Sequence, residues 1–177
     1  MIRLLVALGA LALAGCDRRK ESPPPPPSGS ATLPDLPDPL ILDWQSLHYD
    51  LGSLGTVKAT AGRADFKVTE DEQGAVHASQ DPAVTSDSTG FLALDPPVLV
   101  DLDGDRHEEA VIPFELQHAQ AGSVFGAFVF TLRDGNPVQL ATITTPKKAA
   151  VTIEGATIKM SDGTVWRWDP ATKQLVH

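Results

Sequence analysis

The sequence predicts a mainly β fold, a single antiparallel meander or sandwich-like domain over residues 40–177. After residue 55, hydrophobic and polar residues alternate with a period of two, which is the pattern of strands with one buried face. Gly, Pro and Asp-Gly turn signals interrupt this alternation at short intervals, as they do between the strands of an all-β domain. No window sustains the period of a capped helix, and only residues 43–52 favour a short turn.

The first half of the domain carries weaker strand patterns and then one clear one. Residues 53–79 contain short alternating runs separated by glycine turns. Residues 109–116, EAVIPFEL, alternate clearly and predict a half-buried strand. The apolar positions expected to share one face of this strand are Ala110, Ile112, Phe114 and Leu116. Pro113 has no N–H for a strand ladder, so it indicates an edge position or a bulge.

The next two strands are joined by a turn signal. Residues 123–132, SVFGAFVFTL, are apolar on both faces, which is typical of a central strand. Asp134 and Gly135 then form a hairpin signal before a further strand around residues 138–144.

The C-terminal segment predicts a meander of short strands, with turns at residues 154–155 and 162–163. Trp166 and Trp168 fall on one face of their strand and Arg167 on the other. The tryptophans are expected to be core or edge-covering residues, and a ligand-stacking platform is the alternative.

Charge and cysteine content exclude several classes of protein. Residues 40–177 hold 10 Lys and Arg against 19 Asp and Glu, a formal charge of −9. Nucleic-acid binding requires a basic face, so no nucleic-acid partner is expected. Cys16 is the only cysteine, which leaves the domain without a disulfide or a thiolate metal site.

The first fifteen residues have the pattern of a signal peptide. Arg3 is followed by eleven apolar residues, Leu4 to Ala14, which are too few for a membrane-spanning helix of about 20 residues. The stretch ends in LAGC, which resembles the lipobox of bacterial lipoproteins. That resemblance implies cleavage between Gly15 and Cys16 and lipidation of Cys16, with palmitate among the acyl groups. An ordinary secretory signal with a chance cysteine is the alternative.

Residues 16–39 predict a flexible tether between the lipidated cysteine and the domain. Eight of the fifteen prolines fall between Asp17 and Pro39, and large apolar residues are almost absent there. Such a chain favours extended polyproline II structure and could span roughly 70 Å at about 3.1 Å per residue. The predicted address is the bacterial cell envelope, facing the periplasm or the outer surface, with the choice of inner or outer membrane left open.

The stretch VDLDGDRHEEAV, residues 100–111, holds the one candidate metal site. Alternate residues in a tight turn can direct their oxygens to one point, and Ca²⁺ prefers six to eight such oxygen ligands. The candidate calcium ligands are Asp101, Asp103, Asp105, His107 through its backbone carbonyl, and Glu109. The alternative is an acidic turn whose carboxylates accept hydrogen bonds from backbone amides and face water, with Arg106 neutralising part of the charge.

Two known calcium loops are similar to this stretch. An EF-hand needs Gly at position 6 and Glu at position 12, where this chain has Arg106 and Ile112. The stretch resembles instead the shorter loop of FG-GAP and VCBS-type repeats, with Gly104, Glu109 and the strand AVIPF in the expected places. Arg106 replaces the usual second glycine and is expected to require a left-handed backbone. The motif occurs once, so a propeller is not expected.

Residues 91–168 also resemble uncharacterised bacterial secreted and lipid-anchored proteins that carry one such loop, then a Gly/Phe-rich strand and a late Asp-Gly hairpin. That resemblance implies a cellular address and a fold, and no activity.

Three classes of function are compatible with these features. The first is a lipid-anchored cell-envelope protein with a binding or structural role, attached to the membrane by its anchor and with weak calcium binding at the loop. The second is an accessory subunit that docks on an envelope protein complex, which an exposed apolar patch near the tryptophans would favour. The third is an envelope enzyme. It is the least supported class, because the sequence has no G-x-S-x-G, H-E-x-x-H, P-loop or G-x-G-x-x-G motif and no catalytic residue can be named.

Overall fold

The computed structural model describes residues 42–119, 122–145, 148 and 150–177. The chain divides into two units, Met1–Leu33 and Pro34–His177, and all described residues belong to the second. The predicted signal peptide, the predicted cleavage site, Cys16 and the tether lie outside the described residues.

The predicted mainly β class is confirmed. The described residues form strands and two short 3-10 helices. In chain order these are η2 (Trp44–Ser46), β1 (His48–Asp50), η3 (Gly52–Leu54), β2 (Thr56–Lys58), β3 (Arg63–Glu70), β4 (Val76–Ser79), β5 (Thr89–Leu94), β6 (Val98–Val100), β7 (Glu109–His118), β8 (Gly122–Arg133), β9 (Asn136–Thr145), β10 (Val151–Ile153), β11 (Thr157–Met160), β12 (Val165–Asp169) and β13 (Gln174–Val176).

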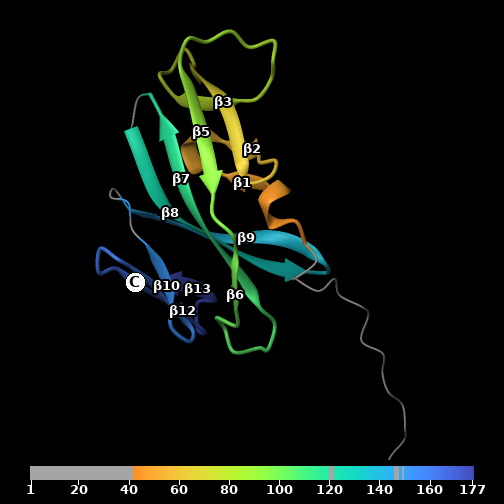
Figure 1. Ribbon diagram of the computed structural model, residues 1–177, viewed down its shortest axis with the longest axis vertical. Coiled ribbons are helices and arrows are strands. Elements are labelled where there is room, and N and C mark those ends of the chain that lie inside the picture. Colours follow the sequence, from red (N-terminus) through yellow and green to blue (C-terminus); the bar gives the residue numbers. More distant parts are fainter. Residues whose placement is uncertain (1–41, 120–121, 146–147, 149) are drawn as a thin grey trace, which may run out of the picture. The chain divides into compact units, whose positions relative to one another are not determined.

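Three antiparallel sheets make up the domain (Figure 1). The largest has seven strands in the order β4-β3-β5-β7-β8-β9, with β6 added beside β7. Strands β1 and β2 form a separate hairpin, and β10 to β13 form a four-stranded meander in chain order. The predicted central strand is confirmed as β8, between β7 and β9, and the predicted C-terminal meander is confirmed as β10–β13.

Strand β7 differs from the prediction of a half-buried strand. Its first four residues are all buried, including Val111 at 0 % exposed and Glu109 at 3 % exposed, which belong to the face predicted to be open. The reason is that both faces of the large sheet are covered at this point. On one face lies a first core, which includes Ile112, and on the other a second core, which includes Val111 and Ile158.

The expected edge position of Pro113 is wrong, because β7 lies inside the sheet. Pro113 is tolerated because it lies where the partner strand on one side of β7 changes from β5 to β6. The pairing with β5 ends at Phe114, the pairing with β6 begins at Val111, and the Pro113 carbonyl accepts the N–H of Asp95 at 2.9 Å. A residue in an antiparallel strand directs its N–H and C=O to the same neighbour. The missing donor therefore faces the connection between β5 and β6, where no strand is paired.

The first core joins the β1–β2 hairpin to the large sheet. Tyr49 is fully buried, and its hydroxyl donates a hydrogen bond to the Trp44 carbonyl. Its ring centroid lies 4.8 Å from that of Phe128, which in turn stacks on Phe114 at 4.2 Å. Burial raises the pKa of Tyr49, so the phenol stays protonated and acts as a donor.

The second core joins the four-stranded sheet to the opposite face of the large sheet. Ile158 and Met160 of β11 are buried against Val129 of β8 and Ile143 of β9. Trp166 packs partly against this core, while Arg167 between the two tryptophans is exposed. The predicted division of the β12 side chains between two faces is therefore confirmed.

Candidate metal site in the 101–109 loop

The acidic loop closes the hairpin between β6 and β7. Val100 at the end of β6 pairs with Glu109 at the start of β7, so the residues between them form the turn. Gly104 and Arg106 both have a left-handed backbone, with φ of 81° and 75°. The left-handed conformation expected at Arg106 is thus confirmed.

Three of the five predicted ligand residues come together. One carboxylate oxygen each from Asp101, Asp103 and Glu109 lies within 4.8 Å of the others. Two oxygens on opposite sides of a calcium ion are about 5 Å apart, so this spacing fits a cation between them. The Asp105 carboxylate is not part of this group, which is made of side-chain atoms. The predicted contribution of the His107 backbone carbonyl stays a prediction.

The same carboxylates also hold the turn by hydrogen bonds to backbone amides. Asp101 accepts the N–H groups of Gly104 at 2.7 Å and Arg106 at 3.1 Å. Asp103 accepts the N–H of Asp105 at 3.0 Å, and Asp105 accepts the N–H of His107 at 2.7 Å. These hydrogen bonds form within the turn itself and need no metal. Each carboxylate nevertheless has about four lone-pair sites, so lone pairs remain for a cation.

Glu109 is the buried member of the group. Its carboxylate accepts the Leu102 N–H at 2.9 Å and the Thr131 hydroxyl at 3.3 Å. Burial is the main cause that raises the pKa of Glu109, and the negative charges of Asp103 and Asp105 raise it further, against the lowering effect of the two hydrogen bonds. A divalent cation beside these carboxylates would favour the ionised form of Glu109 and offset the repulsion.

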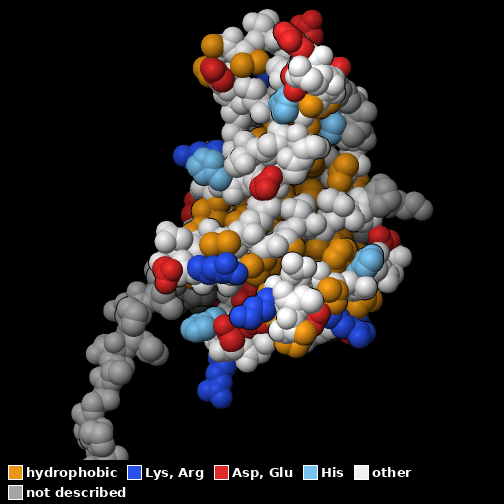
Figure 2. All heavy atoms as spheres, turned by 180° about the vertical axis from the view of Figure 1, so that it is seen from behind, with side chains coloured by type: hydrophobic (Ala, Val, Ile, Leu, Met, Phe, Trp, Pro, Cys, Tyr) orange, Lys and Arg blue, Asp and Glu red, His pale blue; other side chains and the backbone are white. Residues whose placement is uncertain are grey.

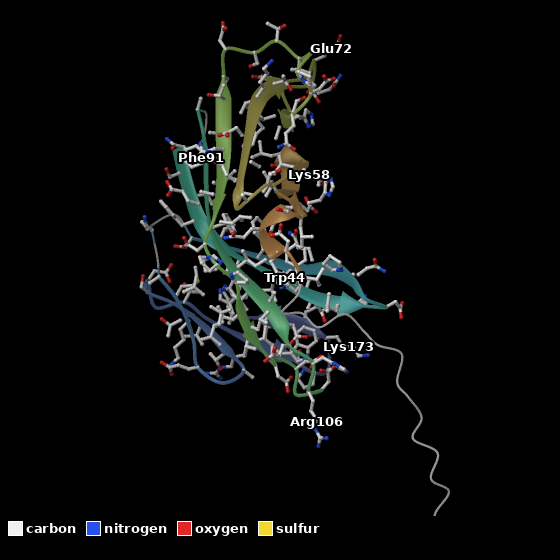
Figure 3. The ribbon with its side chains drawn as sticks, turned by 45° about the vertical axis from the view of Figure 1, so that its right-hand side comes forward. Trp44, Lys58, Glu72, Phe91, Arg106 and Lys173 are labelled. Carbon is white, nitrogen blue, oxygen red and sulfur yellow. The ribbon has the colours of Figure 1, made fainter. Side chains whose placement is uncertain are left out.

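Arg106 does not neutralise the carboxylates in the way that the metal-free interpretation expects. Its side chain points away from the end of the loop (Figure 3). Within the described part of the chain, Arg106 takes part in no ion pair.

A cavity of about 300 Å³ lies beside the loop. Asp103, Asp105 and Glu109 line it together with Trp168 and Lys173 from the C-terminal meander. Sequence reasoning did not connect Trp168 with the loop, since the two are distant in the chain and no local pattern relates them.

The exposed apolar surface near the tryptophans, which would favour docking on a partner, is small. Both tryptophans are partly buried, and Val176, paired with Arg167 and 44 % exposed, is the large exposed hydrophobic side chain of that sheet.

Basic and acidic side chains are interspersed on the face of the molecule in Figure 2, and hydrophobic atoms gather across its middle. Among the described residues, no helix is both long and apolar enough to span a bilayer.

Comparison with known proteins finds no family model, no curated protein and no solved structure that matches this chain.

Proposed function

We propose that this protein is a lipid-anchored component of the bacterial cell envelope whose β domain has a binding or structural role. The observation that carries this proposal is the sequence LAGC, residues 13–16, directly after an eleven-residue apolar stretch. The domain supports it in one respect. Its described residues form two hydrophobic cores, so its stability does not need the disulfides on which many small exported domains rely.

The anchor has a physical basis in the burial of acyl chains. Each buried methylene contributes about 0.8 kcal/mol, and stable attachment needs more than one chain. Lipidation of Cys16 with several chains provides this, and the proline-rich residues that follow act as a spacer between the bilayer and the domain.

Labelling with radioactive palmitate tests the anchor. The wild-type chain is expected to incorporate label and to accumulate as an uncleaved precursor when the lipoprotein signal peptidase is inhibited with globomycin. Cys16→Ser is expected to remove both effects. The matched control is Cys16→Ser combined with Ser22→Cys, which restores a thiol outside the lipobox and is expected to stay unlabelled. Unlabelled wild-type protein, or label that persists in Cys16→Ser, contradicts the proposal.

A second candidate function, weak calcium binding, is favoured by the convergence of Asp101, Asp103 and Glu109. We propose that a calcium ion there stabilises the turn between β6 and β7, with a dissociation constant in the range of about 10⁻⁴–10⁻³ M that is typical of extracellular modules. Binding to the folded state alone stabilises it by about 1.4 kcal/mol when the ion is at tenfold excess over that constant.

Thermal melting of the full chain tests this candidate. Millimolar Ca²⁺ is expected to raise the melting temperature and excess EDTA to reverse that rise, whereas Asp103→Asn is expected to respond to neither. Asp71→Asn is the matched control, because Asp71 also accepts backbone N–H groups in a tight turn but lies outside the cluster. A wild-type melting temperature that ignores both EDTA and Ca²⁺ leaves the loop as a metal-free turn.

A further inference from the structure

A larger cavity, of about 720 Å³, lies at the other end of the large sheet. Its side chains come from β3, β5 and β7 and from the segment after β4. Its lining includes Arg63, Asp65, Lys67, Gln80, Phe91 and Gln117. On β3 Arg63, Asp65 and Lys67 alternate with Ala64, Phe66 and Val68 of the first core, so their side chains lie on the opposite face of the sheet. Phe66 also borders the cavity. Figure 3 agrees, with Phe91 on the side of β5 away from Lys58.

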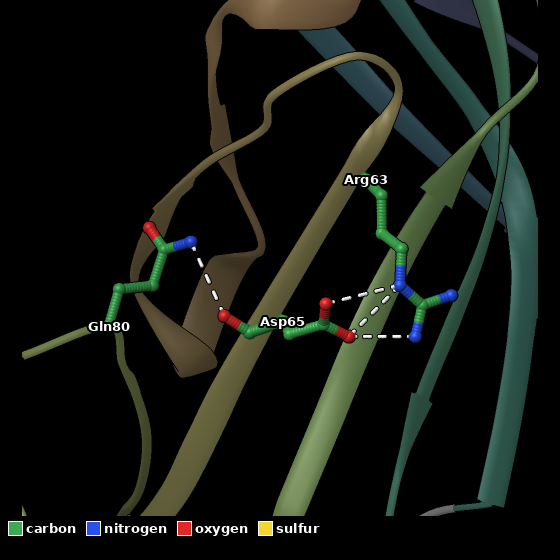
Figure 4. Close-up of polar contacts among 3 residues, drawn as sticks. All are labelled: Arg63, Asp65 and Gln80. Atoms are coloured by element: carbon green, nitrogen blue, oxygen red, sulfur yellow. Dashed lines mark hydrogen bonds and ion pairs between the residues drawn. The ribbon is translucent and has the colours of Figure 1, made fainter. Parts of the chain in front are cut away.

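Hydrogen bonds hold the wall of this cavity in place. The Lys67 ammonium donates to the carbonyls of Val84 and, at 3.4 Å, of Pro82. The Gln80 amide accepts the Lys58 N–H at 2.7 Å and donates to the Lys58 carbonyl at 2.9 Å. It also donates to the Asp65 carbonyl at 3.4 Å, as Figure 4 shows. The wall is therefore formed before any ligand arrives, which reduces the entropy lost on binding.

The floor contains an aromatic ring that is fixed by its neighbours. Asp65, Phe91 and Gln117 lie in one row across β3, β5 and β7. The Arg63 guanidinium donates to the Asp65 carboxylate at 2.7 and 3.0 Å (Figure 4) and lies over the Phe91 ring, 4.5 Å from its centroid. Asp65 thus orients Arg63, and Arg63 in turn restrains Phe91.

The charges of the lining favour an uncharged ligand. Two cationic side chains, Arg63 and Lys67, line the cavity together with two carboxylates, Asp65 and Asp81, so the formal charges cancel. Arg63 is already paired with Asp65, and Lys67 with backbone carbonyls. An anion would meet the two carboxylates, and a cation would meet Arg63 and Lys67.

We propose that this cavity binds an uncharged oligosaccharide. The C–H groups of a sugar ring pack against an aromatic ring, whose face is partly negative, and its hydroxyls both donate and accept hydrogen bonds. Phe91 and the Arg63 guanidinium that lies over it together provide the surface for the sugar ring. The Gln117 amide provides both a donor and an acceptor, and the Asp65 carboxylate accepts from a hydroxyl. The volume lies within the range of about 300–1,000 Å³ that is usual for small-ligand sites.

The cavity and the acidic loop have no lining residue in common. The saccharide proposal therefore depends neither on the lipid anchor nor on calcium, and each can fail without the other.

Amide chemical shifts of the ¹⁵N-labelled full chain, in micelles of a detergent without a sugar headgroup, test the proposal. Chitotriose, maltotriose and cellotriose are titrated separately to millimolar concentration, and inorganic phosphate serves as the anionic probe. At least one trisaccharide is expected to shift the amides of residues 63–67, 79–81, 89–91 and 117, and phosphate is expected to leave them unchanged. The absence of shifts with all three sugars, or a shift of these amides by phosphate, overturns the proposal.

Two variants and a matched control assign the binding to the cavity. Phe91→Leu is expected to weaken the dissociation constant about tenfold, since it keeps apolar volume and loses the ring. Gln117→Ala is expected to weaken binding as well, and serves if Phe91→Leu perturbs the spectrum outside the cavity. Phe125→Leu makes the same change on the same face of the sheet, at a residue that does not line the cavity, and is expected to bind as wild type does. Equal affinity in Phe91→Leu and Gln117→Ala overturns the proposal.

Discussion

Arg106 occupies a backbone conformation that disfavours its own side chain. Its φ is 75°, in the left-handed region where a Cβ approaches the following carbonyl. Glycine reaches this region with little penalty, and glycine is the residue that similar calcium loops carry at the same place. The guanidinium does not offset this backbone strain with an ion pair in the loop, because among the described residues it pairs with no carboxylate.

Arg106→Gly is therefore expected to stabilise the protein relative to Arg106→Ala by about 1 kcal/mol. Both variants lose the guanidinium, so their difference isolates the backbone strain from the charge. The measurement is urea unfolding of the two variants in EDTA. Equal free energies of unfolding would show that the loop relaxes around a non-glycine residue at this position.

Glu109 is a second residue in an unfavourable environment, because its ionisable carboxyl is buried. The residue is 3 % exposed, and burial raises the pKa of its carboxyl because the charged form loses water. The buried carboxylate holds the Leu102 N–H, so it links the start of β7 to the start of the loop. This link explains why an acidic residue is found at a position that is otherwise part of a hydrophobic strand.

At the scale of elements, a short polar link connects the edge strand β9 with the turn between β11 and β12. The hydroxyl of Thr145 at the end of β9 donates to the Asp162 carboxylate at 2.7 Å, and the same carboxylate accepts the Thr164 N–H at 2.9 Å. The Thr164 amide is the first cause that lowers the pKa of Asp162, and the Thr145 hydroxyl is the second. One carboxylate therefore positions the turn of the four-stranded sheet against the large sheet.

The pH dependence of stability tests this link. The pKa of Asp162 is lowered in the folded state, so its contribution is present above the ordinary value of 3.8 and is lost as the pH falls through the folded value. Asp162→Asn is expected to be less stable than wild type at neutral pH, and the difference is expected to shrink towards about pH 3.

The matched control is Asp87→Asn, which changes an exposed carboxylate in the segment between β4 and β5. Denaturant unfolding at the two pH values measures the difference for both variants. A destabilisation by Asp162→Asn that is the same at both pH values would contradict an ionic role for Asp162.

At the scale of the whole domain, the two cores share their central strands. Ile112 and Phe128 belong to the first core, while their chain neighbours Val111 and Val129 belong to the second. Strands β7 and β8 therefore carry one core on each face. Neither core can lose these strands without exposing the other, so the cores are expected to unfold together.

Tryptophan fluorescence can follow each core separately. The combination Trp166→Phe with Trp168→Phe leaves Trp44 as the reporter of the first core, and Trp44→Phe leaves the two tryptophans of β12 as reporters of the second. In each variant the fluorescence midpoint in urea is expected to coincide with the midpoint from circular dichroism. This comparison within one variant is independent of any loss of stability that the substitution causes. Separate midpoints in either variant would show that the sheets unfold independently.

The sequence by itself determined the β class, the central position of β8, and the turns at Asp134-Gly135 and at residues 154–155 and 162–163. The left-handed backbone at Arg106 was expected from the loop's resemblance to FG-GAP and VCBS-type repeats. These features are local. Side-chain alternation and turn chemistry depend on residues a few positions apart, so they can be read from the chain before its strands are paired.

Only the tertiary structure decided which strands are neighbours and which faces are covered. The order β4-β3-β5-β7-β8-β9 brings Asp65, Phe91 and Gln117 into one row, and the four-stranded sheet buries the second face of β7. Of the predicted calcium ligands, Asp101, Asp103 and Glu109 converge, but the burial of Glu109 and the place of Trp168 beside it follow from packing. The physical reason is that burial depends on what lies opposite a residue in space, and no pattern along one strand specifies its partner on another.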